Sequence, residues 1–587
     1  MNKKFIGFSL PNLRCRSLEA MKFVGLTGVL AFSLSQTAVA QRAEDQAHQA
    51  LYEQGFSAKQ ARLLAQDRLR EEALLNQSSQ LRAERVEIFL NGYRYVVTDE
   101  KKKEVQLIRL KEKDPEISNH YDGEVNIPAT IKVGEDTYTV TSIGRSVFLG
   151  KTIHSLTIPE TIRRIERAAF AYCRGLKAIH IPDSVEELGD CAFALCNDAR
   201  SLYIGKKVAK VGEDVFEDCY YLQKIEVGDG NPIYSVRDGI LYNKDQSELL
   251  KCPSYRKDFT ELTLPSTVKK IAKGALEYCF YISKITLNDG LEEIHKKAFH
   301  QNYALSSLHI PASVKYIADG TVFCRTKKLS TLTVASGNQH YKAQENMLYS
   351  FDGSTLISHP AGLADSLMVK VADGVKNIGT SAFEYCRSVK SIQLPASVET
   401  VGVAAFSDCG IHEFYLPEKV KSLPFALFAD CAELTYLYLG DAIASVSGSV
   451  FGGCKSLKLL QIRTVVPPVM EVDSDKDPYT IDDDVKKNAR LEVPSAAVNA
   501  YKAAPEWKEF TNISDKLAAQ DIAASSDWLS VRAGELVVAA DEVLPIVVYD
   551  FSGQVLAKTR ARAWSVRLPA GNYVVVLGTQ AHRVHID

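Results

Sequence analysis

Four aspartates in the second half of the chain have the spacing of a calcium-binding loop. Asp473, Asp475, Asp477 and Asp484 occupy the first, third, fifth and twelfth positions of that pattern, and carboxylate oxygens are ligands that calcium prefers. The pattern is broken at its sixth position, where Pro478 replaces the usual glycine, and its twelfth residue is Asp rather than Glu. A solvated acidic loop explains the same residues. The four aspartates are therefore weak metal-ligand candidates, and no cofactor is predicted.

Cysteine is the second residue type whose spacing could do chemistry. Eight of the twelve cysteines lie three residues after a recurring aromatic position. Identical side chains that stack in a repeat point in parallel, which favours a ladder of small buried thiols, with disulfides as the alternative in an exported protein. No Cys-x-x-Cys pair occurs, so a zinc cluster is not indicated. The eight are Cys173, Cys196, Cys219, Cys279, Cys386, Cys409, Cys431 and Cys454.

The motifs of the common enzyme classes are missing from the sequence. There is no Gly-x-Ser-x-Gly, no His-Glu-x-x-His and no glycine-rich phosphate loop, so we predict that the protein is not an enzyme. Its 70 basic and 72 acidic side chains leave a net charge of −2, which gives no general attraction to nucleic acid. These observations favour a binding or structural protein.

The aromatic position that precedes each of these cysteines recurs at a nearly constant interval. Most steps are 22 to 24 residues, and a period in this range is typical of a solenoid. Eleven such positions predict eleven rungs stacked around a continuous apolar interior. Glycine often stands four residues earlier, as at Gly189 and Gly212, where we expect a bend with positive φ. The eleven positions are Phe148, Phe170, Phe193, Phe216, Leu276, Phe299, Phe323, Phe383, Phe406, Phe428 and Phe451.

Two insertions interrupt the series, at residues 228–264 and 335–374. Each has Asp-Gly beside strand-like residues, which predicts a hairpin. Matching residues of the two insertions are 107 positions apart, as Tyr234 and Tyr341 show, so a larger block has been duplicated. Insertions on one face of a solenoid often carry specificity, and duplicated filler is an equally good interpretation.

The repeated unit resembles the BspA-like leucine-rich repeats of bacterial surface proteins. In residues 162–182 the pattern runs through Phe170 and Cys173 to Leu176, Ile179, Ile181 and Pro182. The resemblance covers residues 140–463 and extends into the flanking segments. It implies a leucine-rich repeat solenoid with parallel strands on one face. It also implies a cell-surface adhesin or colonisation factor with a role in virulence.

Alternation along each strand identifies the side chains that face outward. Ile179 and Ile181 are expected inside and His180 outside. Outward aromatic residues are candidate contacts for a protein or glycan ligand, because they combine an apolar face with a polar tip. Strand propensity alone also favours tyrosine on a sheet surface. The candidate binding residues are His180, Tyr203, His309, Tyr415, Tyr436 and Tyr438.

The segments that flank the solenoid differ from it in composition. Residues 1–40 have a basic start, an apolar run and a small-residue cleavage site ending at Ala40, which predicts a secretory signal peptide. No later segment has the ~20 consecutive apolar residues of a transmembrane helix. The other flanking segments are predicted as a helical segment at 41–86, an N-terminal β cap at 87–139 and a C-terminal cap at 464–516.

Residues 517–587 contain short strands divided by turns and predict a small all-β sandwich. This stretch resembles the C-terminal sorting domain of the type IX secretion system of Bacteroidetes. The resemblance implies secretion across the outer membrane by that machinery, removal of the domain and anchoring to surface lipopolysaccharide. A sandwich that itself binds a ligand is the alternative. The residues of the sorting motif are Tyr549, Asp550, Gly553, Pro569, Gly571 and Tyr573.

The sequence thus predicts an exported cell-surface protein that binds a protein or glycan on its solenoid face. The alternative is a structural component of the cell surface or biofilm matrix that associates with itself.

Overall fold

The computed structural model describes most of the chain after residue 85. The predicted signal peptide and nearly all of the predicted helical segment lie outside the described residues. None of the helices in the described ranges combines the length and hydropathy of a membrane span. The described residues are 86–90, 92–109, 123–363, 368–471, 481–515, 529–532, 535–550, 555–569, 571–577 and 580–586.

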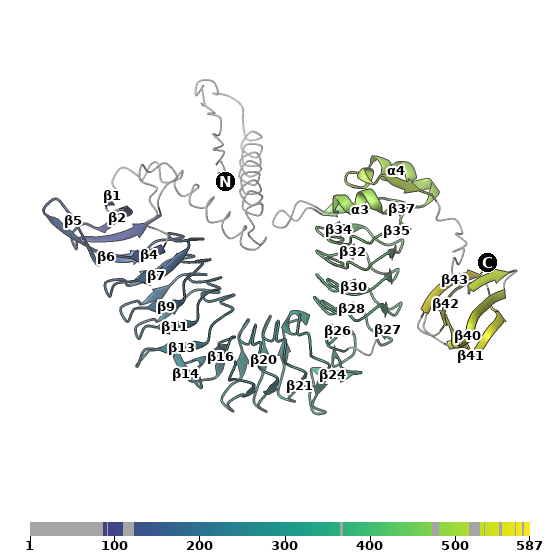
Figure 1. The fold of residues 1–587 in the computed structure, drawn as a ribbon, viewed down its shortest axis with the longest axis horizontal. Coiled ribbons are helices and arrows are strands. Elements are labelled where there is room, and N and C mark those ends of the chain that lie inside the picture. The colour runs from purple at the N-terminus through teal and green to yellow at the C-terminus, as the bar shows by residue number, and fades with distance from the viewer. Residues whose placement is uncertain are drawn as a thin grey trace, which may run out of the picture. The chain divides into compact units, whose positions relative to one another are not determined.

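Successive rungs pair through two parallel ladders of strands. In the long-strand ladder, Ile179 of β9 (Ala178–Ile181) lies opposite Leu202 of β11 (Ser201–Ile204). In the short-strand ladder, Ile165 of β8 (Arg164–Ile165) lies opposite Leu188 of β10 (Glu187–Leu188). The rungs follow one another in chain order (Figure 1). The predicted solenoid is therefore confirmed.

The long-strand ladder contains sixteen strands in the described residues, so the predicted count of eleven rungs is wrong. In one of the additional turns, the one before β27, His359 takes the aromatic position and stacks on Phe383. The sixteen are β4 (Gly123–Asn126), β7 (Ile153–Thr157), β9, β11, β13 (Lys224–Val227), β17 (Glu261–Thr263), β19 (Lys284–Thr286), β21 (Ser307–Ile310), β23 (Thr331–Val334), β27 (Met368–Lys370), β29 (Ser391–Gln393), β31 (Glu413–Tyr415), β33 (Tyr436–Leu439), β35 (Leu459–Ile462), β37 (Arg490–Glu492) and β38 (Asn512–Ser514).

The short-strand ladder runs along a second face and is divided into separate sheets at the two insertions and between residues 401 and 422. Its strands are β3 (Glu104–Ile108), β6 (Asp136–Ile143), β8, β10, β12 (Lys210–Val211), β16 (Glu248–Lys251), β18 (Lys270–Ile271), β20 (Glu293–Ile294), β22 (Tyr316–Ile317), β26 (Thr355–Ser358), β28 (Asn377–Ile378), β30 (Thr400–Val401), β32 (Ser422–Leu423), β34 (Ser445–Ser447) and β36 (Val469–Glu471).

Each insertion forms three antiparallel strands, and the third strand joins the short-strand ladder. In the first insertion β14 (Tyr234–Arg237) pairs with β15 (Ile240–Asn243), β15 pairs with β16, and β16 continues in parallel to β18. In the second, β24 (Tyr341–Gln344), β25 (Met347–Ser350) and β26 repeat this arrangement up to β28. The insertions are thus built into the solenoid.

A buried asparagine fixes the entry to each insertion. The Asn231 side-chain amide donates to the carbonyl oxygens of Gly205 (2.9 Å) and Val208 (3.2 Å), and its oxygen accepts from two backbone N–H groups. Asn338, 107 residues later, makes the equivalent four bonds. The shared network supports a duplication of the whole block.

The aromatic side chains stack one above another in the interior. The rings of Phe148 and Phe170 have centroids 4.9 Å apart, and those of Phe170 and Phe193 are 5.0 Å apart, with planes within 10° of parallel. The buried His359 continues the series, with its ring 5.2 Å from that of Phe383. The interior is therefore a row of stacked rings, and it forms three apolar clusters along the chain.

The cysteines of the described residues are free and buried. Cys196 Sγ donates to the carbonyl oxygen of Phe170 in the preceding rung at 3.2 Å, and Cys431 makes the same bond to Phe406 at 3.0 Å. Thr326 occupies the cysteine position of its own rung and bonds the Phe299 carbonyl at 2.8 Å. A small buried donor at this position therefore links several pairs of neighbouring rungs.

The glycines before the aromatic position do not have the predicted positive φ. A Cβ atom on Gly189 would lie 2.4 Å from the backbone nitrogen of Arg167, and one on Gly212 would lie 2.4 Å from that of Asp190. Glycine is therefore needed there because neighbouring rungs approach closely, and the prediction of a left-handed bend was wrong.

Both ends of the solenoid carry additional elements. At the N-terminal end, β1 (Glu87–Leu90) and β2 (Tyr93–Asp99) extend the sheet of β3, and β5 (Thr130–Val133) pairs with β6. At the C-terminal end the fully buried Trp507 donates from Nε1 to the Pro468 carbonyl at 2.9 Å. The elements of this end are α3 (Asp483–Asn488), η4 (Ser495–Ala497), α4 (Val498–Ala503) and η5 (Trp507–Glu509); a further short helix, η3 (Gly320–Val322), lies within the solenoid.

The last described strands form one antiparallel sheet, and the predicted sandwich is not confirmed. The long strand β40 pairs with β39, β41 and β42, and β43 pairs with β42. The sheet comprises β39 (Leu529–Arg532), β40 (Glu535–Asp550), β41 (Val555–Arg567), β42 (Gly571–Leu577) and β43 (Gln580–Ile586).

Candidate functional site

Outward side chains of the long-strand ladder lie in rows because the strands pair in register. His180 lies opposite Tyr203, and Tyr203 lies opposite Glu226. Tyr415 lies opposite Tyr438. In the middle of β9 and β11 the flanking apolar residues are buried, so the row itself faces solvent. The ladder thus presents a surface on which residues far apart in sequence become neighbours.

His180 and Tyr203 form a stacked pair in this row. Their ring centroids are 4.7 Å apart and their planes differ by 9°. The Tyr203 hydroxyl donates to Asp183 Oδ1 at 2.9 Å, and the Lys206 backbone N–H donates to the same oxygen. Burial and the Asp183 carboxylate raise the pKa of Tyr203 to about 12. The hydroxyl therefore stays protonated, and the ring is held in place.

Tyr415 and Tyr438 form a second stacked pair, with centroids 5.0 Å apart and planes 25° from parallel. The Arg463 guanidinium lies 5.3 Å from the Tyr438 ring centroid. Tyr436, two residues before Tyr438 and also directed outward, is 42% exposed. These four residues combine aromatic faces, hydroxyl groups and a cation, which is the chemistry of a protein or glycan contact.

The third predicted position, His309, is more isolated. Its Nδ1 lies 2.9 Å from Thr333 Oγ1 on the next strand. In the part of the chain that the structure describes, no ring contact links it to the two stacked pairs. The predicted residues therefore gather into two aromatic groups rather than one site.

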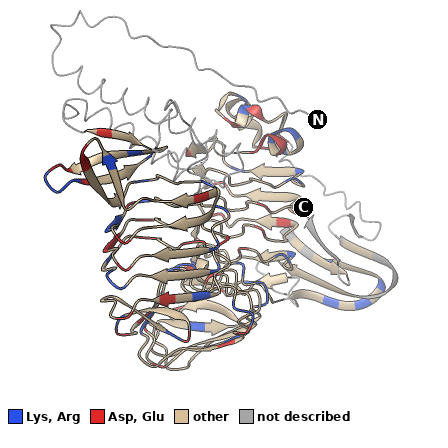
Figure 2. Cartoon of the chain, turned by 60° about the vertical axis from the view of Figure 1, so that its left-hand side comes forward, with Lys and Arg blue, Asp and Glu red and all other residues tan. Residues whose placement is uncertain are grey.

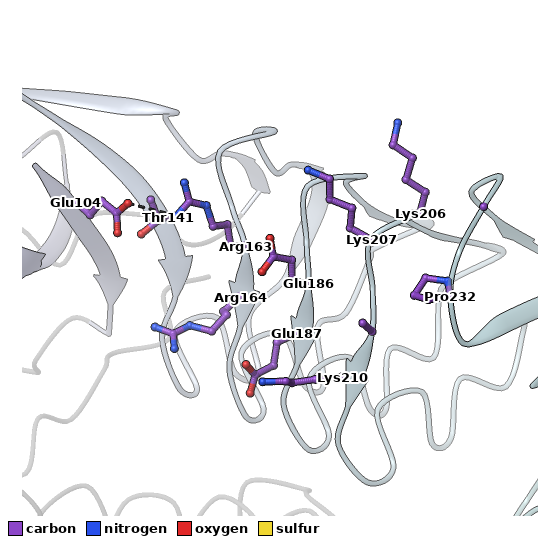
Figure 3. Close-up of a pocket in the computed structure, with 12 residues that line it drawn as sticks. Glu104, Thr141, Arg163, Arg164, Glu186, Glu187, Lys206, Lys207, Lys210 and Pro232 are labelled. Atoms are coloured by element: carbon purple, nitrogen blue, oxygen red, sulfur yellow. Dashed lines mark hydrogen bonds and ion pairs between the residues drawn. The ribbon is translucent and has the colours of Figure 1, made fainter. Parts of the chain in front are cut away.

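A hollow of about 770 Å³ opens along the short-strand ladder. Glu187 of β10 lies in register between Arg164 and Lys210 of the neighbouring strands (Figure 3). Arg163 makes an ion pair with Glu104 at 3.3 Å at one end of the hollow. Charges of opposite sign thus alternate from β8 through β10 to β12, which stabilises adjacent strands. The lining of the hollow as a whole contains five Lys or Arg and three Glu. Figure 2 shows the same mixture of charges elsewhere in the solenoid, where Lys and Arg are interspersed with Asp and Glu.

The calcium hypothesis is not tested by the structure. Asp473, Asp475 and Asp477 lie outside the described residues, and Asp484 is exposed in the first turn of α3. Across the described ranges, no group of three His, Cys, Asp or Glu residues has the arrangement of a metal site. The four aspartates remain a prediction.

The sorting-motif residues in the described part lie on or beside neighbouring strands. Tyr549 of β40 lies opposite Val574 of β42, and Asp550 lies opposite Tyr573. The Tyr573 hydroxyl donates to the Pro569 carbonyl at 2.5 Å, just before Gly571 begins β42. Gly553 lies outside the described residues. A role of these residues in sorting remains a prediction.

An aromatic cluster that the sequence pattern did not predict lies in the turns before β13, β17, β19 and β21. The Tyr255 ring lies 5.1 Å from Tyr221, 5.4 Å from Tyr281 and 6.2 Å from Phe280. Phe280 in turn contacts Tyr303 at 5.4 Å. The available signal was the presence of aromatic residues directly after the cysteine position in three rungs, those of β13, β19 and β21. We define the aromatic cluster as Tyr220, Tyr221, Tyr255, Tyr278, Phe280, Tyr281 and Tyr303.

Three comparisons with known proteins bear on this arrangement. The family model described as the BspA type leucine rich repeat region matches residues 141–256, 251–358 and 366–468. No curated protein matches the chain.

Among solved structures, the chain is similar to a leucine rich cell surface protein from Faecalibacterium prausnitzii. The two are 23% identical over 73% of this chain and 94% of that chain, with a TM-score of 0.38. A leucine-rich repeat protein from Bacteroides ovatus is 18% identical over 66% of this chain and 98% of that chain, with a TM-score of 0.31. The family model matches more than half of the chain, and this chain therefore belongs to the BspA type leucine-rich repeat family.

Proposed function

We propose that this chain is an exported cell-surface protein that binds a protein or glycan ligand on its long-strand face and acts as an adhesin or colonisation factor. The observation that carries the proposal is the stacked pair of Tyr415 and Tyr438 beside the exposed Tyr436. Aromatic side chains in ordered, accessible rows supply much of the binding energy of many interfaces. Export is supported by the predicted signal peptide and by the sorting motif around Tyr549 and Tyr573.

The test is a pull-down of host extracellular proteins and bacterial glycans with the full chain and with the Tyr415→Ala/Tyr438→Ala variant. We expect the variant to lose affinity for the captured ligand by about tenfold or more. Tyr316→Ala is the matched control, because Tyr316 is 44% exposed on the short-strand ladder. Unchanged binding by the double variant would remove the tyrosine pair from the proposal.

Self-association as a structural component of the surface or biofilm matrix is the second candidate. It is favoured by the exposed Val465, Val466 and Val469, which are 59%, 69% and 67% exposed beside or on β36. In the described residues β36 pairs only with β34, and an exposed apolar strand edge promotes association. Light scattering across concentrations separates the two candidates, because a monomer at every concentration contradicts self-assembly.

A further inference from the structure

The aromatic cluster spans the turns of four consecutive rungs and is distinct from the long-strand face. Tyr221 precedes β13, Tyr255 precedes β17, Tyr281 precedes β19 and Tyr303 precedes β21. At a rung spacing of ~4.8 Å, four rungs span about 14 Å. Tyr221 and Tyr303 are each 38% exposed. The cluster therefore offers several partly accessible rings along one line of turns.

The second copy of the duplicated block shows that the scaffold does not need these rings. The Tyr255 backbone N–H donates to the Leu222 carbonyl at 2.7 Å, and the equivalent Gly362 N–H donates to Leu329 at 2.8 Å. The loop is thus anchored identically in both copies. Six of the seven members of the cluster have non-aromatic residues 107 positions later, which are Lys327, Lys328, Gly362, Arg387, Ser388 and Gly410. The rings in the first copy therefore call for a reason other than folding.

Two cations lie against the same rings. The Arg200 guanidinium is 4.9 Å from the Tyr221 ring centroid and 5.5 Å from that of Tyr255. The Lys257 amine is 5.8 Å from the Tyr255 centroid. In the described ranges neither cation forms a direct ion pair with a carboxylate; Asp198, on which Arg200 acts electrostatically, accepts hydrogen bonds from Gly175 N–H and Lys177. Both cations therefore lie beside the rings without a carboxylate bound to them.

We propose that the aromatic cluster binds an acidic polysaccharide. Tyrosine rings pack against the C–H faces of sugar rings and their hydroxyls bond sugar hydroxyls, while Arg200 and Lys257 bind the carboxylate or sulfate groups of the polymer. A linear polymer fits a row of turns better than a folded partner does, because each rung repeats the same contact along one direction.

The test measures binding of the full chain to polygalacturonate, to dextran sulfate and to neutral dextran. We expect at least one acidic polymer to bind and neutral dextran to bind at least about tenfold more weakly. The polygalacturonate and dextran sulfate arms distinguish carboxylate from sulfate recognition. Arg200→Gln/Lys257→Gln and, separately, Tyr221→Ala/Tyr303→Ala are each expected to weaken acidic-polymer binding at least tenfold. Lys257 is exposed, so Lys257→Gln alone should leave folding intact. We expect this single variant to lose part of the affinity for the acidic polymer.

The matched control is Lys455→Gln/Lys458→Gln, which removes the same charge from a turn before β35, six rungs beyond that of Tyr303, where both lysines are exposed. We expect this variant to bind the acidic polymers as the parent does. The proposal is overturned if neither acidic polymer binds, if neutral dextran binds equally well, or if the control weakens binding as much as Arg200→Gln/Lys257→Gln.

Discussion

Cys196 Sγ donates a hydrogen bond to the carbonyl oxygen of Phe170, one rung earlier, at 3.2 Å. Both residues are fully buried. The thiol therefore connects two rungs at the point where the aromatic rings stack, and it does so as a donor rather than as half of a disulfide.

The donor role can be tested with two isosteric substitutions. Cys196→Thr keeps a donor, as Thr326 does in its own rung, whereas Cys196→Val leaves the Phe170 carbonyl without it. We expect the Val variant to be less stable than the Thr variant by ~1–3 kcal/mol. Denaturant unfolding of both variants measures the difference. If the Cys196→Val variant is as stable as the Cys196→Thr variant, the Cys196 thiol contributes to stability only through packing.

The ring stack predicts the cost of removing one ring. Phe193 lies 5.0 Å from Phe170 and 6.3 Å from Phe216 between centroids. Phe193→Ala opens a cavity in the stack and should lower the free energy of unfolding by ~3–5 kcal/mol. Phe193→Leu is the control, because Leu276 occupies the equivalent position of another rung. We expect Phe193→Leu to lower the free energy of unfolding less than Phe193→Ala does. Equal losses would mean that the stacked ring, rather than the apolar volume, accounts for the stability.

His359 predicts a pH dependence of stability. Burial lowers the pKa of His359 to about 4, from 6.5 in the unfolded chain. As the pH falls from 6.5 toward 4, the unfolded state binds a proton that the folded state does not, so stability falls. Between pH 7 and pH 5 this loss is about 2 kcal/mol.

His359→Phe restores the ring found at this position in other rungs and removes the titrating group. We therefore expect the free energy of unfolding of the variant to change less between pH 7 and pH 5 than that of the parent protein. An identical dependence in both proteins would show that other groups cause it.

Asn231 and Asn338 predict a matched pair of effects. Each side chain makes four hydrogen bonds at the start of an insertion while almost fully buried. Replacing either residue with Ala leaves buried backbone groups without partners and should cost on the order of 3 kcal/mol. Asn488→Ala, at an exposed position of α3, should change stability by less than ~0.5 kcal/mol. Thermal unfolding compares the three variants.

The repeat made the solenoid predictable, because Phe170, Phe193 and Cys196 recur at positions that only a stack of rungs can bury together. The rung count was wrong because it included only turns with Phe or Leu at the aromatic position. It therefore missed turns such as the one in which His359 occupies that position. The aromatic cluster was missed for a similar reason. Tyr255 belongs to an insertion outside the repeat frame, and its contact with Tyr221 arises only from the fold.

The duplicated block has a consequence for how such chains change over time. Because its inserted hairpin ends in a strand that pairs like any other rung, a copy of the block can be added by recombination without creating a new boundary. The number of rungs in the solenoid and the surface chemistry of each copy can then change independently. Both copies keep the same anchor, as the bonds from Tyr255 to Leu222 and from Gly362 to Leu329 show, while the side chains around it differ.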